Sequence, residues 1–262
     1  MSVRIVVDST ASLPPEIAEE LGITVIPLHV MGEAEGEEST SGLSALELTA
    51  CYARQLERGG DDGVVALHLS KTLSSTWSAA VTAAAVFPGT VRVVETDTVG
   101  MAIGAAAMAA AAVAREGGDL DACEAMAKST LERAGSWLYL HQLEDLRKSG
   151  RLSAGTALSA TLLATKPILH LHGGKFELAA KTRTQTKAFA RLAELVMEPA
   201  GDQPVFAAVQ HAEAPEAAQQ VAATLEEVLP GGSKVLVGPL AEVLAAHTGP
   251  GAIGLSVVFA SE

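Results

Sequence analysis

The sequence predicts an α/β protein with two lobes: an N-terminal α/β/α lobe on a parallel, doubly wound sheet, and a C-terminal α/β lobe with a mixed sheet. In the first half of the chain, short β-branched runs alternate with helical patterns, which is typical of parallel sheets. From Trp137 the pattern changes and includes a hairpin signal. With 262 residues, of which 48% are hydrophobic, the chain can bury two cores. We therefore expect lobes at residues 1–134 and 135–262.

The elements of the first lobe follow from apolar periodicity and turn residues. Pro14-Pro15, coming after Ser12, indicates a helix that runs through Leu21. The strands expected here are Arg4–Val7, Ile23–Val30, Val64–Leu69 and Val91–Val94. The further helices expected are Leu43–Arg58, Trp77–Val86, Val99–Ala114 and Asp119–Arg133. The glutamate-rich segment Gly32–Ser39 is expected to be an exposed loop.

The second lobe contains a hairpin signal at Gly173-Gly174, which stands between two apolar runs. The strands expected are Trp137–Leu140, Pro167–Leu171, Lys175–Ala180, Val205–Gln210, Val235–Val237 and Ile253–Phe259. The helices expected are Thr184–Ala200, Pro215–Leu229 and Leu240–Ala246, with a helix or turn after LEDLRKSGRLS to about Leu163. This half of the chain is therefore expected to form a smaller α/β lobe.

Val64–Ala80 is the stretch that points most directly to a function. A buried strand leads into the hydroxyl-rich turn SKTLSST, and a helix follows. Backbone N–H groups and hydroxyls at the carboxyl end of a strand can bind a small anion. Two other strand ends carry similar turns, DST and TDT, so we expect a ligand site at this edge of the sheet. The alternative is that the hydroxyls only cap the helix.

Composition excludes several classes of protein. The net charge of −13 argues against sequence-independent binding of nucleic acid. Cys51 and Cys123 stand in apolar helical patterns, and we expect inert thiols in a reducing compartment. The chain reaches Asp8 before a signal region can form, and Val99–Ala114 is short and rich in alanine. We therefore expect a cytoplasmic protein without an integral membrane segment.

Positive charge is concentrated in one segment of this acidic chain. Residues 147–191 contain nine Lys or Arg residues and a single acid, Glu177. Such a segment is typical of a surface that meets an anion, a phosphate or an acidic partner. A solvated face is the alternative.

The segment LAAHTGPGAIG near the C-terminus formally matches the dinucleotide motif G-x-G-x-x-G. That interpretation fails because a helix precedes the motif and a strand follows it. His247 stands near the end of the preceding helix, which favours a charged imidazole that could donate to a carboxylate. A purely structural role for His247 is the alternative.

No cofactor or metal is expected. His170-x-His172 has a spacing that zinc can use, but no third ligand stands nearby. The chain contains neither a P-loop nor G-x-S-x-G. A serine nucleophile with His247 as its base remains an alternative without a motif.

Eight motifs occur in an order that resembles the DegV family over about residues 3–260. They are VDSTASLP, ITVIPL, TS at Thr40-Ser41, HLSKTLSSTWSAA, LEDLRKSGRLS, KPIL, KTRTQTKA and HTGPGAIG. The resemblance implies a bacterial two-lobed α/β protein that holds one long-chain fatty acid between its lobes. It also implies that the protein is the acyl-binding subunit of fatty acid kinase and not itself an enzyme. A separate ATP-binding partner would phosphorylate the carboxylate to an acyl-phosphate for phospholipid synthesis.

The resemblance implies roles for individual residues. Those expected to hold the fatty-acid carboxylate are Thr40, Ser74, His247, Arg151, Ser9 and Thr10. Among these, Arg151 is expected to act through water. Ser75, Gly249 and Gly251 are expected to form the turns around the headgroup, and Arg183 is expected to dock the kinase.

The chain departs from the family pattern in five places and leaves alternatives open. The segment from Pro27 to Thr40 is shorter, TSQPS is TSGLS, GGR is SGR, the glycine of LSGT is Ser75, and the DS after the third strand is TDT. Ser75 adds a Cβ where the backbone approaches the ligand, so the headgroup geometry is expected to shift. A small-molecule hydrolase or transferase using Ser74 and His247 is one alternative, and a carrier of another apolar anion is a second. The chain is expected to be a monomer.

Overall fold

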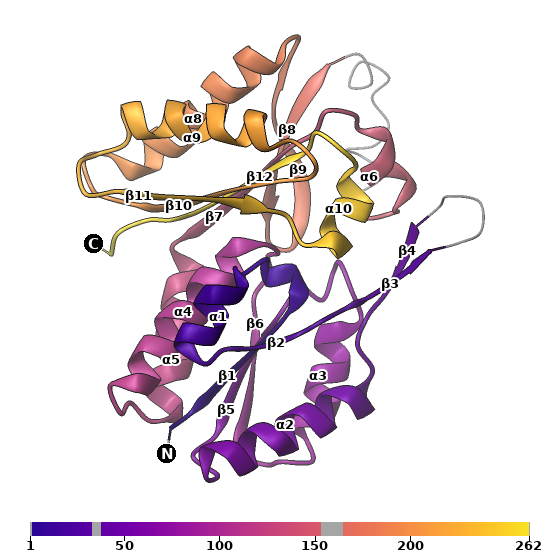
Figure 1. Cartoon of the computed structure of the whole chain (residues 1–262), viewed down its shortest axis with the longest axis vertical. Coiled ribbons are helices and arrows are strands. Elements are labelled where there is room, and N and C mark those ends of the chain that lie inside the picture. Colours follow the sequence, from indigo (N-terminus) through magenta and orange to yellow (C-terminus); the bar gives the residue numbers. More distant parts are fainter. Residues whose placement is uncertain (1, 33–37, 153–164, 262) are drawn as a thin grey trace. The chain divides into compact units, whose positions relative to one another are not determined.

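The structure, a computed structural model, describes residues 2–32, 38–152 and 165–261. The chain divides into two compact units, Met1–Glu132 and Arg133–Glu262. Each unit has its own main sheet and its own helices (Figure 1).

The first unit is built on a four-stranded parallel sheet in the order β2-β1-β5-β6. Its strands are β1 (Arg4–Asp8), β2 (Thr24–Ile26), β5 (Val64–His68) and β6 (Val91–Glu95). Every residue of β5 is buried, because the strand is central and helices cover both faces of the sheet. The predicted parallel sheet is confirmed.

Helices flank this sheet on two sides. They are α1 (Pro15–Leu21), α2 (Ala45–Gly59), α3 (Thr76–Ala84), α4 (Met101–Arg115) and α5 (Leu120–Glu132). Figure 1 shows α4 and α5 on one face and α2 and α3 on the other. The small side chains of α4 are mostly buried, as predicted for this alanine-rich segment. Across the described ranges, no helix is long and apolar enough to cross a membrane.

The predicted strand Ile23–Val30 is wrong, because the chain forms two strands there. β2 ends before Pro27, and β3 (His29–Gly32) pairs with β4 (Glu38–Ser41) in a separate antiparallel hairpin. Proline has no N–H to continue the parallel ladder. The predicted loop at Gly32–Ser39 therefore includes the ends of β3 and β4, while its centre, 33–37, lies outside the described residues.

The second unit is built on a six-stranded mixed sheet in the order β11-β10-β12-β7-β8-β9. Its strands are β7 (Ala134–Tyr139), β8 (Lys166–His172), β9 (Lys175–Thr182), β10 (Phe206–His211), β11 (Lys234–Pro239) and β12 (Ile253–Val258). Only β10 and β11 pair in parallel, which confirms the predicted mixed sheet. Gly173 and Gly174 both have positive φ and form the predicted hairpin turn.

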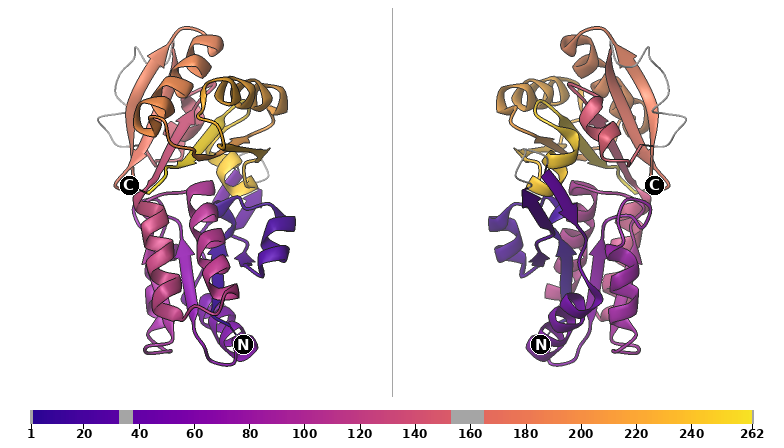
Figure 2. Two further views of the ribbon diagram at one scale, coloured as in Figure 1. Left: turned by 90° about the vertical axis from the view of Figure 1, so that its left-hand side faces the viewer. Right: turned by 90° about the vertical axis from the view of Figure 1, so that its right-hand side faces the viewer.

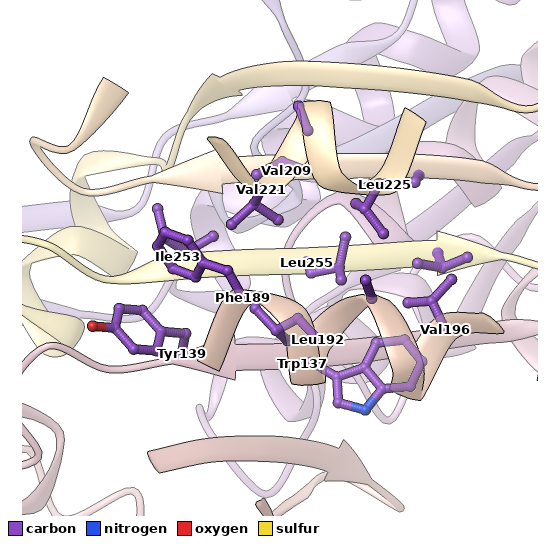
Figure 3. Packing of buried hydrophobic residues seen from close by; sticks show 14 of the residues in the cluster. Trp137, Tyr139, Phe189, Leu192, Val196, Val209, Val221, Leu225, Ile253 and Leu255 are labelled. Atoms are coloured by element: carbon purple, nitrogen blue, oxygen red, sulfur yellow. The ribbon is translucent and has the colours of Figure 1, made fainter. Parts of the chain in front are cut away.

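Two long helices, α8 (Gln185–Ala200) and α9 (Pro215–Val228), run side by side over one face of this sheet (Figures 1 and 2). Their apolar faces meet the strands in a core that includes Phe189, Leu192 and Leu225 (Figure 3). Burying each such side chain contributes roughly 1.5–3 kcal/mol. Two shorter helices, α6 (Glu144–Lys148) and α10 (Glu242–Thr248), contact each other. The helix or turn predicted to about Leu163 lies outside the described residues.

Candidate functional site

The carboxylate of Asp8 joins the carboxyl ends of β1 and β5. Asp8 is the last residue of β1 and is 1% exposed. One carboxylate oxygen accepts hydrogen bonds from the backbone N–H and the hydroxyl of Thr10. The other accepts from the backbone N–H of Leu69 at 3.0 Å and lies 3.0 Å from His68 Nδ1. Four donors thus surround this buried carboxylate and tie the two turns together.

His68 and Tyr52 extend the network into the core. Both side chains are fully buried, and the Tyr52 hydroxyl lies 2.9 Å from His68 Nε2. Burial raises the pKa of the Tyr52 phenol, so the phenol keeps its proton and donates it to Nε2. His68 then carries its own hydrogen on Nδ1 and donates to Asp8. This network was not predicted, although Asp8 and His68 end two strands that a doubly wound sheet can place side by side.

Ser9 and Thr10 use their hydroxyls differently. Thr10 is fully buried and its hydroxyl donates to Asp8, so that hydrogen is committed within the protein. Ser9 is half-buried, and its Oγ accepts from the backbone N–H of Leu28 at 3.0 Å. Among the described residues, no acceptor takes the Ser9 hydrogen. Of the two residues, the geometry therefore favours Ser9 as a direct contact for a ligand.

The turn between β5 and α3 brings together the hydroxyls of Ser74 and Thr76. Their oxygens are 3.0 Å apart, and Ser74 Oγ also accepts from the backbone N–H of Thr76. Thr76 is fully buried, and its Oγ1 accepts from the backbone N–H of Leu43. A buried hydroxyl hydrogen needs an acceptor, so Thr76 donates to Ser74. Among the described residues, no acceptor then takes the hydrogen of Ser74. Thr76, which positions the Ser74 hydroxyl, was not predicted.

Thr40 lies just before the segment that connects β4 to α2, and this segment contacts the Ser74 turn. It lies in β4 opposite Val30, two residues before Gly42. A Cβ placed on Gly42 would lie 2.8 Å from Thr76 Oγ1 and 3.1 Å from Ser74 Oγ. The chain just after Thr40 therefore packs directly against the Ser74 turn.

In the second unit, His247 lies in the last turn of α10, and Arg151 is close enough to act on its charge. The pKa of His247 is lowered to about 4, first by burial and then by the positive charge of Arg151. His247 is therefore neutral at pH 7, and the prediction of a charged imidazole is wrong. The favourable effect of a helix C-terminus is only about 0.3–1 kcal/mol at exposed sites, which burial outweighs. A neutral imidazole has one N–H donor and one acceptor nitrogen.

Gly249 and Gly251 let the turn after α10 pack against α6 and the chain before it. Both have positive φ, 71° and 82°. A Cβ on Gly249 would overlap the carboxylate of Asp145 in α6, and one on Gly251 would lie 2.9 Å from the Cβ of His141. Conformation and close approach both require glycine at these two positions.

Arg183 lies between β9 and α8 and is exposed. Lys181 and Lys187 beside it are also exposed. Within the described residues, no carboxylate pairs with any of the three. Their charges are therefore available to an acidic partner.

His170 and His172 lie on β8. The ring of His170 stacks on Trp137 with centroids 5.1 Å apart, and burial lowers the pKa of His170. In the part of the chain that the structure describes, no three His, Cys, Asp or Glu side chains gather to hold a metal ion. The stacking gives His170 a packing role.

Cys51 and Cys123 are buried, unpaired thiols. Burial raises the pKa of both, which keeps them protonated at pH 7. A protonated thiol is a poor nucleophile. This environment agrees with the predicted packing role.

The fold is that of an α/β protein, and these turns gather polar groups whose chemistry suits a small anion or an anionic headgroup. The chain belongs to the DegV family: a family model described as "Uncharacterised protein, DegV family" matches residues 31–260.

The relatives share this architecture over their full length. A DegV domain-containing protein of Corynebacterium glutamicum is 57% identical over 100% of this chain and 96% of its own. The crystal structure of a DegV family protein from that organism matches with a TM-score of 0.97, at 57% identity and covering 100% of this chain and 99% of that one.

Two further solved structures are described by the ligand they bind. A DegV family protein from Thermus thermophilus, described for its fatty acid binding, matches with a TM-score of 0.88 at 29% identity. DegV from Bacillus subtilis, described as a fatty acid binding protein, matches with a TM-score of 0.88 at 27% identity. Each match covers 99% of this chain and 100% of the other.

Proposed function

We propose that this protein binds a long-chain fatty acid and presents its carboxylate to a separate ATP-dependent kinase, which forms an acyl-phosphate. The observation that carries the proposal is the match over 99% of the chain to the Thermus thermophilus and Bacillus subtilis proteins described as binding fatty acids. In this role the chain is a carrier, and the partner kinase performs the reaction. The ATP that the reaction needs places this role in the cytoplasm.

The hydroxyls at the edge of the first sheet support carboxylate binding. Once their contacts with the described residues are counted, Ser9 and Ser74 each keep a hydroxyl hydrogen. Neutral donors stabilise an ionised carboxylate without cancelling its charge in an ion pair. Such a carboxylate retains an oxygen that can attack the γ-phosphate of ATP.

We assign His247, in the second unit, to the same role. Burial lowers its pKa to about 4, so the imidazole is neutral at pH 7 in the ligand-free protein and adds no positive charge there. Arg151 is then the cation of the headgroup site, and we assign it a contact through water. Most of the affinity would come from the acyl tail, at about 0.8 kcal/mol for each buried methylene before ordering costs.

Extraction of the purified protein followed by mass spectrometry tests the binding step. We expect a long-chain fatty acid in the extract, and displacement of a fluorescent fatty acid when a palmitate or oleate is added to delipidated protein. If no lipid is recovered and no acid binds, the proposal is overturned. Recovery of a different apolar acid would support the alternative carrier.

A reconstituted assay tests the presentation step. Loaded protein, ATP and a purified fatty acid kinase subunit should yield acyl-phosphate, trapped as the hydroxamate, and this protein alone should yield none. Turnover of an activated ester by this protein alone, lost in Ser74→Ala, would instead support the hydrolase alternative.

A further inference from the structure

Three hydroxyl groups converge on Gly42. A Cβ placed there would lie 2.8 Å from Thr76 Oγ1, 3.1 Å from Ser74 Oγ and 3.2 Å from Ser75 Oγ. The φ of Gly42 is not positive, so its backbone conformation does not require glycine. Glycine stands there because a side chain would displace the hydroxyls.

The hydroxyl of Ser75 is the one that the protein itself does not use. Ser75 directly precedes α3, yet its side chain makes no capping hydrogen bond. Across the described ranges, its Oγ has no partner, and the residue is exposed. Ser75 therefore offers a hydrogen next to the one that Ser74 keeps.

We propose that Ser75 is a second direct donor to the fatty-acid carboxylate, and that Gly42 keeps the space beside the two serines open. The inference rests on the proposed function and adds a residue to its headgroup site. A carboxylate has two oxygens that each accept hydrogen bonds, so Ser74 and Ser75 can each serve one. The start of α3 adds partial positive charge on the same side.

The affinity of the delipidated Ser75→Ala variant for palmitate tests this role. It is measured as the displacement of a fluorescent fatty acid by palmitate. We expect Kd to rise about tenfold, because a hydrogen bond to a charged group is lost. Ser78→Ala is the matched control, since Ser78 is an exposed serine one turn further along α3. Its Kd should equal that of the wild type.

The pKa of the bound fatty acid's carboxyl group distinguishes a direct hydrogen bond from Ser75 from a merely structural role of that residue. The carboxyl carbon of bound, ¹³C-labelled palmitate can be titrated by NMR in each variant. A lost donor destabilises the ionised form, so Ser75→Ala should raise the pKa of the bound acid, and Ser78→Ala should not.

Gly42→Ala tests whether the space beside the two serines must stay open, and Gly32→Ala is its control. A Cβ on Gly32 would meet no atom of the described residues within 4 Å, and both glycines belong to the same hairpin region. We expect Gly42→Ala to weaken palmitate binding and Gly32→Ala to leave it unchanged.

The outcomes separate this inference from the proposed function. If the wild type binds no fatty acid, the proposed function fails. If the wild type binds, but Ser75→Ala keeps both the wild-type Kd and the wild-type pKa of the bound acid, the role of Ser75 is overturned and the carrier function stands.

Discussion

Asp8 is a buried carboxylate with four hydrogen-bond donors, and the donors come from segments that adjoin the hydroxyl-bearing turns. Thr10 belongs to the turn after β1, and Leu69 to the turn after β5. His68, the last residue of β5, also donates to Asp8 and is itself held by a hydrogen bond from Tyr52 of α2. A buried charge is tolerated only when it is satisfied in this way. The same residues that stabilise the first unit therefore also position its hydroxyls.

The two tyrosines of the chain provide a matched test of this network. Tyr52→Phe removes the donor to His68 Nε2 and leaves a buried acceptor unpaired, so the free energy of unfolding should fall by about 1–3 kcal/mol. Tyr139 is equally buried, but its hydroxyl has no partner among the described residues. Tyr139→Phe should therefore be neutral or stabilising. Urea unfolding followed by circular dichroism measures both, and equal losses would contradict the hydrogen-bond assignment.

The neutral state of His247 makes stability depend on pH. Its pKa falls from 6.5 to about 4 on folding, so between these values the unfolded chain binds more protons than the folded one. The free energy of unfolding should therefore fall as pH drops from 6.5 towards 4. His247→Gln should flatten this slope, as measured by urea unfolding at a series of pH values. An unchanged slope would show that His247 titrates normally.

At the scale of elements, the site depends on the starts of two helices. α2 begins with a capping box, in which Ser44 and Glu47 bond each other's backbone N–H. Leu43, just before it, donates to Thr76 in the first turn of α3. The two starts are thereby tied together, and Gly42 is held against the hydroxyl turn. Hydroxyls at a helix start that is tied to a second helix in this way are better fixed than they would be on a free loop.

The connection from β9 to α8 carries the predicted kinase contact. Arg183→Glu reverses an exposed charge, so we expect slower acyl-phosphate formation with the kinase but unchanged Kd for palmitate. Lys234→Glu is the control, because Lys234 is exposed on β11 at the opposite edge of the same sheet. Loss of palmitate binding in Arg183→Glu, or an equal effect of both variants on the kinase reaction, would remove the docking assignment.

At the scale of the whole molecule, charge is unevenly distributed. The chain carries a net charge of −13, whereas residues 147–191 are strongly basic. An acidic protein repels nucleic acid and other polyanions in general. A basic segment within an otherwise acidic chain can still favour an acidic partner.

Ligand binding should stabilise the whole protein. A fatty acid that binds only the folded state contributes about 2.7 kcal/mol at a free concentration of about 100 times Kd. We therefore expect palmitate to raise the Tm of delipidated protein, measured by scanning calorimetry. The methyl ester of palmitate, which lacks the anionic headgroup, should raise Tm less. Equal shifts for acid and ester would mean that the polar turns do not bind the carboxylate.

Local sequence by itself determined most of the elements and the hydroxyl-rich turn. The buried run Val64–His68 and the alanine-rich helix α4 are recognisable because their periodicity and composition are local properties. The break at Pro27 could also have been read locally from the missing N–H of proline.

Only the tertiary structure decided how the polar groups are used. Asp8, His68 and Tyr52 meet because β1 pairs with β5 and α2 packs on both. Burial made His247 neutral, against the expectation from its helix end. Hydrogen-bond partners and desolvation are set by residues far apart in the chain, so no local pattern of the sequence contains them.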